Sequence, residues 1–287
     1  MPEIVDAHQH FWDLGRNPYP WLQDEPLQGF RYGDDYEAIK RNYLPDDYRR
    51  DAANQNVIAT VHMEAEWARH DPVAESAWLH EIAERHGLPN AVVGWADFSR
   101  PDIAEVLAGH AQYPLLRSIR QKPISMADPK WRQGYALLAR HGFHYDLQAP
   151  WGQLGEAAAL ARDFPDTLII LNHTGLPVDR GEPALAAWRA ALEEFAAQPN
   201  TAIKISGLGQ PGQPWTAMAN RRVVREAIEV FGTERAMFAS NWPVDSLAAD
   251  SLDTIFNGFA ESVADFGEAE RRRLFRDNAM EIYRISL

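Results

Sequence analysis

Two histidines near the start of the chain form the first pattern that could do chemistry. Residues 5–11 read VDAHQHF, so His8 and His10 lie two positions apart. Because side chains alternate across a β-strand, we expect Asp6, His8 and His10 to share one face. Two imidazoles at the end of a strand can bind a metal ion or transfer protons. The pattern therefore predicts a catalytic or metal-binding site at this strand end.

Further polar side chains follow other apolar runs, at the positions where strands would end. Glu64 lies in VHMEAEW, His173 in LIILNHTGLP and Asn241 in MFASNWPVD. The remaining candidates are Arg117 and Arg120 in LLRSIRQKP, Asp146 and Gln148 in FHYDLQAP, Lys204 in AIKISGL, and Trp242 and Asp245 beside Asn241. Polar residues at the carboxyl ends of barrel strands converge on one cavity. We therefore expect these side chains to share a site.

The elements that must position these residues can be read from the hydrophobic pattern. Short apolar or β-branched runs alternate with longer stretches of helical spacing, which is typical of parallel β/α units. The predicted strands are Ile4–Phe11, Val57–Ala65, Ala91–Phe98, Leu115–Arg120, Phe143–Gln148, Leu168–Asn172, Ala202–Ser206 and Ala236–Asn241. Eight such units predict a (β/α)₈ TIM barrel, and no GxGxxG dinucleotide fingerprint follows the first strand.

Helices are expected between these strands, within one domain that spans residues 1–287. The clearest amphipathic stretches are Pro72–His86, Trp131–His141, Gly155–Phe164, Pro183–Ala197, Arg221–Phe231 and Arg271–Tyr283. Residues 13–43 are rich in Trp, Tyr, Pro and Gly and read as a long first βα loop. In a TIM barrel such a loop covers the catalytic mouth.

Composition excludes several classes of protein. The chain has 46% hydrophobic and 24% charged residues, which favours a globular fold over a disordered one. A net charge of −13 argues against sequence-independent nucleic-acid binding. The absence of cysteine leaves imidazole and oxygen as the metal ligands. With neither a long apolar run nor a basic, apolar leader, we expect a cytoplasmic protein without a membrane segment.

Several of these motifs, in this order, resemble one known family. VDAHQHFWD, the arginine strand, NHTGLP, KISGL, SNWPVD and the closing DNAMEIYRI are similar to the amidohydrolase-related lactonases, which include L-fuconolactonase, L-rhamnonolactonase and pyrone dicarboxylate lactonase. The resemblance covers essentially the whole chain and implies a distorted TIM barrel that hydrolyses a lactone. It makes His173 a pocket residue, and it implies that some members work without a bound metal.

Asn241 departs from the family pattern. The resemblance places Asp at this last-strand position, where it activates the attacking water, and an amide has no useful basicity for that task. Three interpretations remain open: Asp245 or Glu64 replaces the base in a natural variant, the Asn is engineered, or the protein binds without catalysis. We favour natural replacement.

The predicted reaction is hydrolysis of a carboxylic ester, most simply a sugar-acid or dicarboxylic lactone. Asp245 or Glu64 is the expected base, and His8, His10, His173 and Arg120 are the expected binders and stabilisers of the oxyanion.

A zinc-like ion held weakly by the three histidines is one expectation, and metal-independent catalysis is the other. The alternative functions are decarboxylation and sugar-acid binding without turnover. The expected partner is a small-molecule substrate, and association into a homo-oligomer stays open.

Overall fold

Eight parallel strands form the centre of the molecule in the computed structural model, which describes residues 2–25, 27, 30–33 and 36–287. They pair in the order of the sequence. Their bounds are β1 Ile4–Gln9, β2 Val57–Met63, β3 Ala91–Trp95, β4 Leu116–Gln121, β5 His144–Leu147, β6 Ile169–Leu171, β7 Thr201–Ile205 and β8 Ala236–Phe238. All eight predicted strands are present, most of them shorter by one to three residues at their ends.

The sheet closes into a barrel between β8 and β1. Gln9 forms a parallel bridge with Trp242. The backbone N–H of Asn241 donates to the carbonyl of His8 at 2.8 Å, and that of His10 donates to the carbonyl of Trp242 at 2.8 Å. The closure of the barrel between β8 and β1 therefore involves His8, His10 and Asn241, which the sequence predicts to be site residues.

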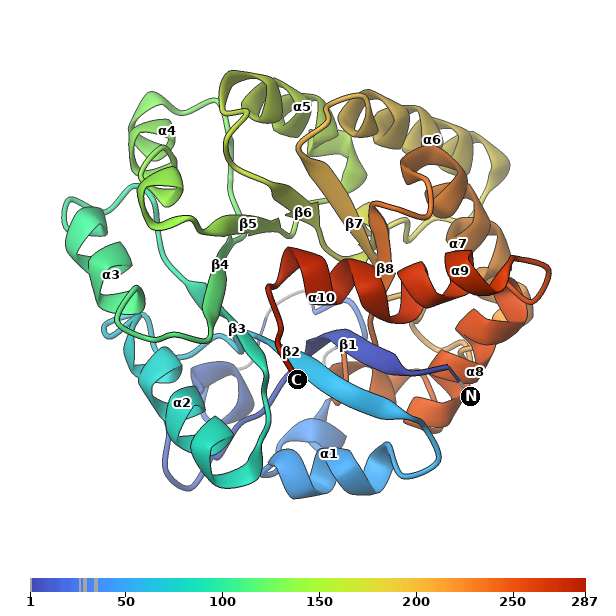
Figure 1. The fold of residues 1–287 in the computed structure, drawn as a ribbon, viewed down its shortest axis with the longest axis horizontal. Coiled ribbons are helices and arrows are strands. Elements are labelled where there is room, and N and C mark those ends of the chain that lie inside the picture. Colours follow the sequence, from blue (N-terminus) through green and yellow to red (C-terminus); the bar gives the residue numbers. More distant parts are fainter. Residues whose placement is uncertain (1, 26, 28–29, 34–35) are drawn as a thin grey trace.

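Helices surround the barrel and cover one of its ends (Figure 1). The α-helices are α1 Pro45–Asp51, α2 Ala74–His86, α3 Ile103–His110, α4 Pro129–Tyr135, α5 Leu154–Asp163, α6 Glu182–Ala196, α7 Ala217–Phe231, α8 Leu252–Ser262, α9 Glu268–Arg272 and α10 Asn278–Ile282. The predicted closing helix Arg271–Tyr283 is interrupted, since a π-helical turn, Arg273–Asp277, joins α9 to α10. This segment crosses the end of the barrel where the strands begin (Figure 1).

Helix α7 illustrates how the sequence sets an element. The hydroxyl of Thr216 accepts a hydrogen bond from the backbone N–H of Ala219, which caps the first turn. Val224, Ile228 and Phe231 recur at helical spacing and are buried against the barrel. Gly232, at a φ of 74°, ends the helix. The apolar stripe therefore fixes which face of the helix meets the sheet.

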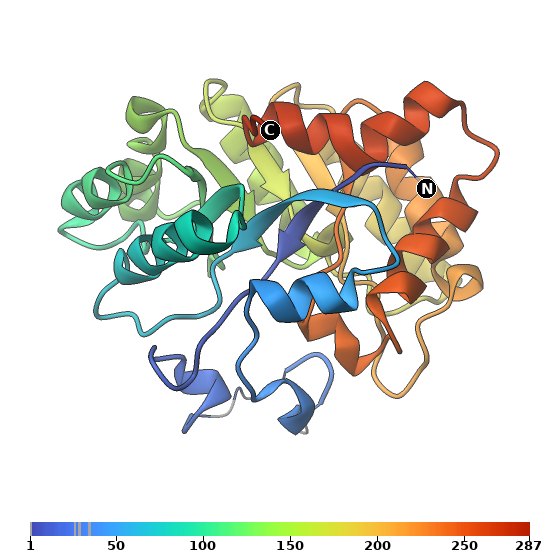
Figure 2. The ribbon, with the colours of Figure 1, turned by 60° about the horizontal axis from the view of Figure 1, so that its bottom comes forward.

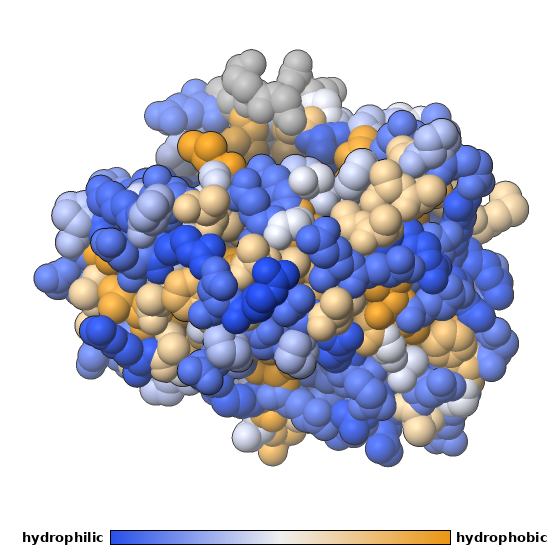
Figure 3. Space-filling model, turned by 90° about the horizontal axis from the view of Figure 1, so that it is seen from above, coloured by the Kyte–Doolittle hydropathy of each residue, from blue (hydrophilic) through white to orange (hydrophobic). Residues whose placement is uncertain are grey.

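Apolar side chains form two layers around the strands. Val5, Ala7 and Met237 belong to a cluster of apolar side chains inside the barrel. Ile203, Ile205 and many others fill the layer between the strands and the helices. None of the helices within the described residues is long and apolar enough to cross a membrane. The side of the molecule that Figure 3 shows is mainly hydrophilic, with hydrophobic side chains scattered between charged ones.

Asp6 does not share a face with His8 and His10, contrary to the alternation rule. Its carboxylate accepts hydrogen bonds from the hydroxyls of Tyr48, at 2.8 Å, and Ser240, at 2.5 Å. Tyr48 lies on α1, outside the barrel. The register of β1 against β2 shifts between Asp6 and Gln9, which is the irregularity that turns His8 inward.

Candidate active site

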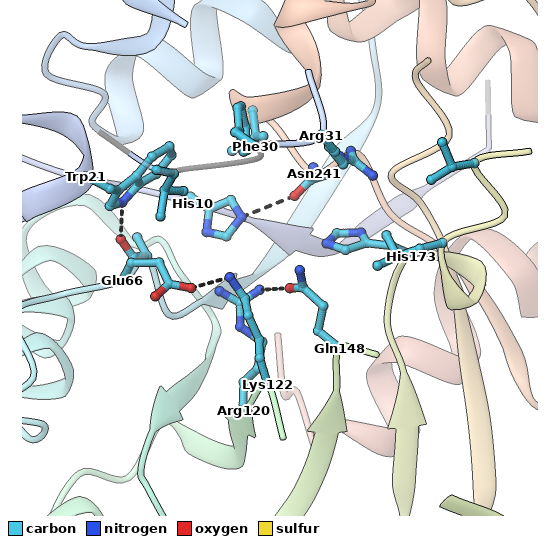
Figure 4. A pocket seen from close by; sticks show the side chains of 15 residues that line it. His10, Trp21, Phe30, Arg31, Glu66, Arg120, Lys122, Gln148, His173 and Asn241 are labelled. Atoms are coloured by element: carbon cyan, nitrogen blue, oxygen red, sulfur yellow. Dashed lines mark hydrogen bonds and ion pairs between the residues drawn. The ribbon is translucent and has the colours of Figure 1, made fainter. Parts of the chain in front are cut away.

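A cavity of about 340 Å³ lies at the carboxyl ends of the strands. It is within the usual size range of small-molecule sites. Its lining residues are His10, Trp21, Leu27, Phe30, Arg31, Ala65, Glu66, Arg120, Lys122, Gln148, His173, Leu176, Val178, Asn241 and Val244. Predicted residues His10, Arg120, Gln148, His173 and Asn241 therefore lie together around one space (Figure 4).

The first βα loop supplies one wall of this cavity. Trp21, Leu27, Phe30 and Arg31 all come from it. Trp21 is anchored because its indole N–H donates to the carbonyl of Ala65 at 2.8 Å. Figure 2 shows the loop, in dark blue, projecting from one end of the barrel. The prediction that residues 13–43 lie over the mouth agrees with this placement, although the sequence did not single out Arg31 or Phe30.

Backbone strain concentrates around the cavity. Glu66, His173, Leu176 and Asn241 line it, and each has a φ between 53° and 59°. L-residues rarely adopt this left-handed region, which costs of order 1–3 kcal/mol per residue. The surrounding structure must therefore hold these side chains in place, as is common at functional sites.

His173 presents one ring nitrogen to the cavity. Its Nδ1 lies 3.0 Å from the hydroxyl oxygen of Ser206. A Cβ at position 207 would come within 2.6 Å of that nitrogen. Only glycine at this position therefore allows the segment after β7 to lie so close to His173. Burial lowers the pKa of His173 well below its usual value, and the charge of Arg31 adds to this effect. The ring is therefore neutral near pH 7, and a neutral imidazole has one nitrogen that can accept a proton.

His10 is held by carbonyl oxygens on both sides. Its Nδ1 lies 2.8 Å from the backbone oxygen of Met63, and its Nε2 lies 3.2 Å from Oδ1 of Asn241. Burial and the charge of Arg120 lower the pKa of His10, whereas the two oxygens oppose that shift. Both oxygens would stabilise a protonated ring.

His8 lies deeper than His10 and His173. Its ring centre is 5.1 Å from that of His10 and 4.5 Å from that of His173. Asn172 donates to Asp146 at 3.3 Å, which turns its Oδ1 toward Nδ1 of His8 at 3.0 Å. Nδ1 of His8 therefore carries the hydrogen, and its buried Nε2 has no hydrogen-bond partner within the described part of the chain.

Asn241 and Asp245 act as one unit. Oδ1 of Asp245 accepts from Asn241 Nδ2 at 2.6 Å, from Arg31 at 2.6 Å and from the hydroxyl of Tyr32 at 2.7 Å. Burial raises the pKa of Asp245 in spite of these donors. Asp245 is absent from the cavity lining, however, and stands behind Asn241. Its expected role as the base is not supported, because the amide separates it from the site.

Glu64 is also unsuited to the role of base. Its carboxylate pairs with Arg120 at 2.6 Å and with Arg69 at 3.2 Å. Burial alone would raise the pKa of Glu64, but these charges and Lys122 hold it well below its usual value. A carboxylate that resists protonation and lies outside the cavity lining cannot take up the proton of a bound water. The sequence pattern placed Glu64 correctly at a strand end, but its expected role as the base is not supported by this environment.

Asp146 and Lys204 lie in the barrel interior, beneath the cavity, and not in its wall. Both side chains are fully buried, and they form an ion pair at 2.8 Å. The hydroxyl of Tyr283 donates to both oxygens of Asp146 at 3.0 Å. Each is the penultimate residue of its strand, one residue before the strand end, and neither lines the cavity, so their expected contact with substrate is not supported.

Arg117 and Trp242 are also placed outside the site. Arg117 is the second residue of β4, and its guanidinium donates to the carbonyls of Tyr283 and Pro114. It lies at the opposite end of the strand from Arg120, since three residues span about 10 Å. Trp242 points away from the cavity, and its indole N–H donates to Asp51 at 2.8 Å. Neither residue lines the cavity, so the structure does not support their substrate-binding assignments.

Several lining residues were not among the predicted site residues. Lys122 and Glu66 form an ion pair at the mouth, and Leu176, Val178 and Val244 complete an apolar wall. They lie in the segments that follow β2, β4, β6 and β8, and Leu176 and Val244 belong to the NHTGLP and SNWPVD motifs. Their position a few residues past the end of a predicted strand is the signal that could have identified them.

Comparison with known proteins places the chain in a family. The family model described as amidohydrolase matches residues 5–285, and the chain belongs to the amidohydrolase family. It is an enzyme of the hydrolase class. Protein y4mH of Sinorhizobium fredii is 45% identical over 98% of both chains. The L-fucono-1,5-lactonase of Burkholderia multivorans is 31% identical over 97% of this chain and 95% of its own length.

A solved structure agrees with the fold. An amidohydrolase from Burkholderia multivorans with bound zinc superposes with a TM-score of 0.83, at 29% identity and 99% coverage of both chains. In the present chain, no group of three or more His, Cys, Asp or Glu side chains among the described residues is arranged to hold a metal ion. His10 Nε2 is directed at an amide oxygen. The buried Nε2 of His8 has no hydrogen-bond partner among the described residues and is available as a ligand, so a metal site formed by His8, His10 and His173 stays a prediction.

Proposed function

We propose that this protein hydrolyses an uncharged aldonolactone, a cyclic ester of a sugar acid. The observation that carries the proposal is the convergence of a neutral His173, whose Nε2 has no hydrogen-bond partner among the described residues, and the Arg120–Gln148 pair on one cavity of about 340 Å³. The lactonase named among the relatives, similar over the whole chain, supports the same reaction class.

The chemistry follows from the groups in place. Nε2 of His173 accepts a proton from water as the water oxygen attacks the lactone carbonyl. Negative charge develops on the carbonyl oxygen and is stabilised by the positive side of the cavity, where Arg120 lies. The ring oxygen then leaves with a proton returned by the imidazolium. One acid group is produced for each lactone consumed.

The charge balance of the cavity favours an uncharged substrate over a dicarboxylic lactone. Each cation that lines it already has a carboxylate partner: Arg31 pairs with Asp245, Arg120 with Glu64, and Lys122 with Glu66. A substrate carboxylate would have to displace one of these partners. The opposite wall, which contains Trp21, Phe30 and Val244, fits the less polar edge of a sugar ring.

A panel of lactones tests this proposal. Acid release followed with a pH indicator should show turnover of aldonolactones and much slower turnover of lactones that carry free carboxylates. Release of carbon dioxide from hydroxybenzoates would favour the decarboxylase alternative. Calorimetric binding of aldonolactones without any turnover would favour a binding protein. The absence of turnover with every lactone, together with turnover of amides or phosphoesters, would overturn the proposal.

The metal requirement is a separate question. An ion held loosely by His8, His10 and His173 stays a prediction, and so does catalysis without metal. Elemental analysis of the purified enzyme, together with rates before and after chelation, decides between them. Whether the chain associates into a homo-oligomer stays open, and light scattering would decide it.

A further inference from the structure

Gln148 occupies a defined place between Arg120 and the two lining imidazoles. It follows β5, and its Oε1 accepts a hydrogen bond from Nη1 of Arg120 at 2.9 Å. Arginine has only donors, so the amide atom facing it must be the oxygen. The amide nitrogen is therefore turned away from Arg120. Figure 4 shows it directed toward the side of the cavity that carries His10 and His173.

Arg120 itself is fully engaged in the structure. Nε donates to Oε1 of Glu64 at 2.7 Å, and Nη2 donates to the backbone oxygen of Glu64 at 2.6 Å. Its guanidinium is almost completely buried, with 4% of the side chain exposed. Arg120 is thus locked by Glu64 on one side and holds Gln148 on the other. Its guanidinium group cannot turn toward a substrate without breaking the buried ion pair with Glu64.

From this arrangement we infer that the amide N–H group of Gln148 is the hydrogen-bond donor to the lactone carbonyl, with Arg120 as a positioning residue. The inference rests on the proposed lactonase function and refines it. The guanidinium draws electron density from the amide oxygen, which makes the amide N–H a stronger donor. A fixed donor aimed at the developing oxyanion is worth more than a mobile charge, because it needs no reorganisation during the reaction.

The neighbouring residues fit this division of tasks. Asn241 presents an oxygen to His10, since its nitrogen is used by Asp245. His173 serves as the proton acceptor. Among the residues that line the cavity, Gln148 is then the neutral side chain that offers an N–H donor not used by another protein group in the described structure.

Two variants separate the donor from the rest of the side chain. Gln148→Glu keeps an oxygen that faces Arg120 and replaces the N–H donor with an acceptor. Gln148→Leu removes both groups. We expect either change to lower kcat by about 100- to 1,000-fold, the range for loss of one oxyanion donor, with a much smaller change in KM. Gln112→Leu, at an exposed site, is the matched control and should leave both constants unchanged.

Arg120→Lys tests the positioning role. Lysine keeps the charge but lacks the fork that holds both Glu64 and Gln148. We expect kcat to fall in this variant, and the further loss from adding Gln148→Leu to be far smaller than in the wild type. Fully multiplicative losses in the double variant would show that Arg120 does not act through Gln148.

Binding of an aldonolactam, a cyclic amide that is not hydrolysed, makes the test independent of turnover. By calorimetry, Gln148→Leu should weaken binding by about tenfold, the value of one hydrogen bond. If the wild type hydrolyses no lactone but this weakening is found, the proposed function is wrong and the donor assignment stands. Unchanged kcat in the Gln148 variants, equal binding of the lactam, or no binding to the wild type would overturn the inference.

Discussion

Two polar layers inside the same barrel have opposite properties. In the lower layer, Asp146 and Lys204 are fully buried and face each other. In the upper layer, at the strand ends, His173 and Gln148 keep donor or acceptor atoms directed into an open cavity. Buried polar groups without partners cost free energy, so groups left open toward a cavity need a functional reason. The difference separates residues that hold the barrel from residues that act on a substrate.

The largest expected effect belongs to the lower layer. Lys204→Met removes the cation and leaves the carboxylate of Asp146 buried without its ion pair, which should lower the free energy of unfolding by about 3–5 kcal/mol. Urea unfolding measures this value. The control is Lys122→Met, whose partly exposed pair with Glu66 should contribute less than about 1 kcal/mol. An equal loss of unfolding free energy in both variants would contradict the distinction between the two layers.

The upper layer should show the reverse pattern. His173→Ala removes the proposed proton acceptor and should lower kcat by at least about 100-fold. The melting temperature should change little, because strand-end residues at the mouth serve function more than packing. His70→Ala, at an exposed position, is the control. A His173 variant that unfolds, or one that keeps its rate, would contradict the assignment.

Asn241→Asp tests whether the enzyme works without a carboxylate at position 241 or lacks an essential base there. The amide nitrogen of Asn241 donates to Asp245 at 2.6 Å, so an Asp in its place would set two carboxylates against each other. Their repulsion raises the pKa of one of them. We expect activity to stay within about tenfold of the wild type or to fall, since 100-fold is the lower range for a recovered general base. A gain of two orders of magnitude would mean that an essential base had been missing.

A smaller effect should come from Glu75, which is buried behind the cavity beside Glu64. Burial, with the charge of Glu64, raises the pKa of Glu75 from 4.5 to about 8. A raised carboxyl pKa means that the folded state holds the proton more tightly, so this contribution to stability is complete below pH 4.5 and is lost as the pH rises through 8.

The side chain introduced by Glu75→Gln cannot ionise, so the melting temperature of this variant should depend less on pH than that of the wild type. Thermal unfolding at pH 5, 6.5 and 8.5 should show the variant gaining melting temperature relative to the wild type at each step, by several degrees in total. A constant difference between the two proteins would mean that Glu75 does not titrate in this window.

The sequence predicted the fold well because its signals are local. Eight apolar runs and the helical spacing between them determine the barrel, and all eight strands are present. The face of β1 on which each side chain lies could not be predicted, because the shift in register between Asp6 and Gln9 depends on pairing with β2. Asp6 therefore faces Tyr48 and Ser240 rather than the cavity.

The site could be predicted in outline but not in its division of tasks. Strand-end position brought His10, Arg120, Gln148, His173 and Asn241 together. Arg117 shows the limit of that rule, because the same strand carries one arginine at each end. The pairing of Glu64 with Arg120, and of Asp245 with Arg31, depends on contacts between distant segments, which no spacing in the sequence reveals.

The most direct measurement is the rate of acid release from one uncharged aldonolactone by the wild type and by His173→Ala, at equal concentrations of folded enzyme. The account predicts saturable turnover by the wild type, one proton released per lactone, and a rate at least about 100-fold lower for the variant. Turnover that is equal in both proteins, or absent from the wild type while the lactone binds, would contradict the claim that the upper layer is a lactonase site.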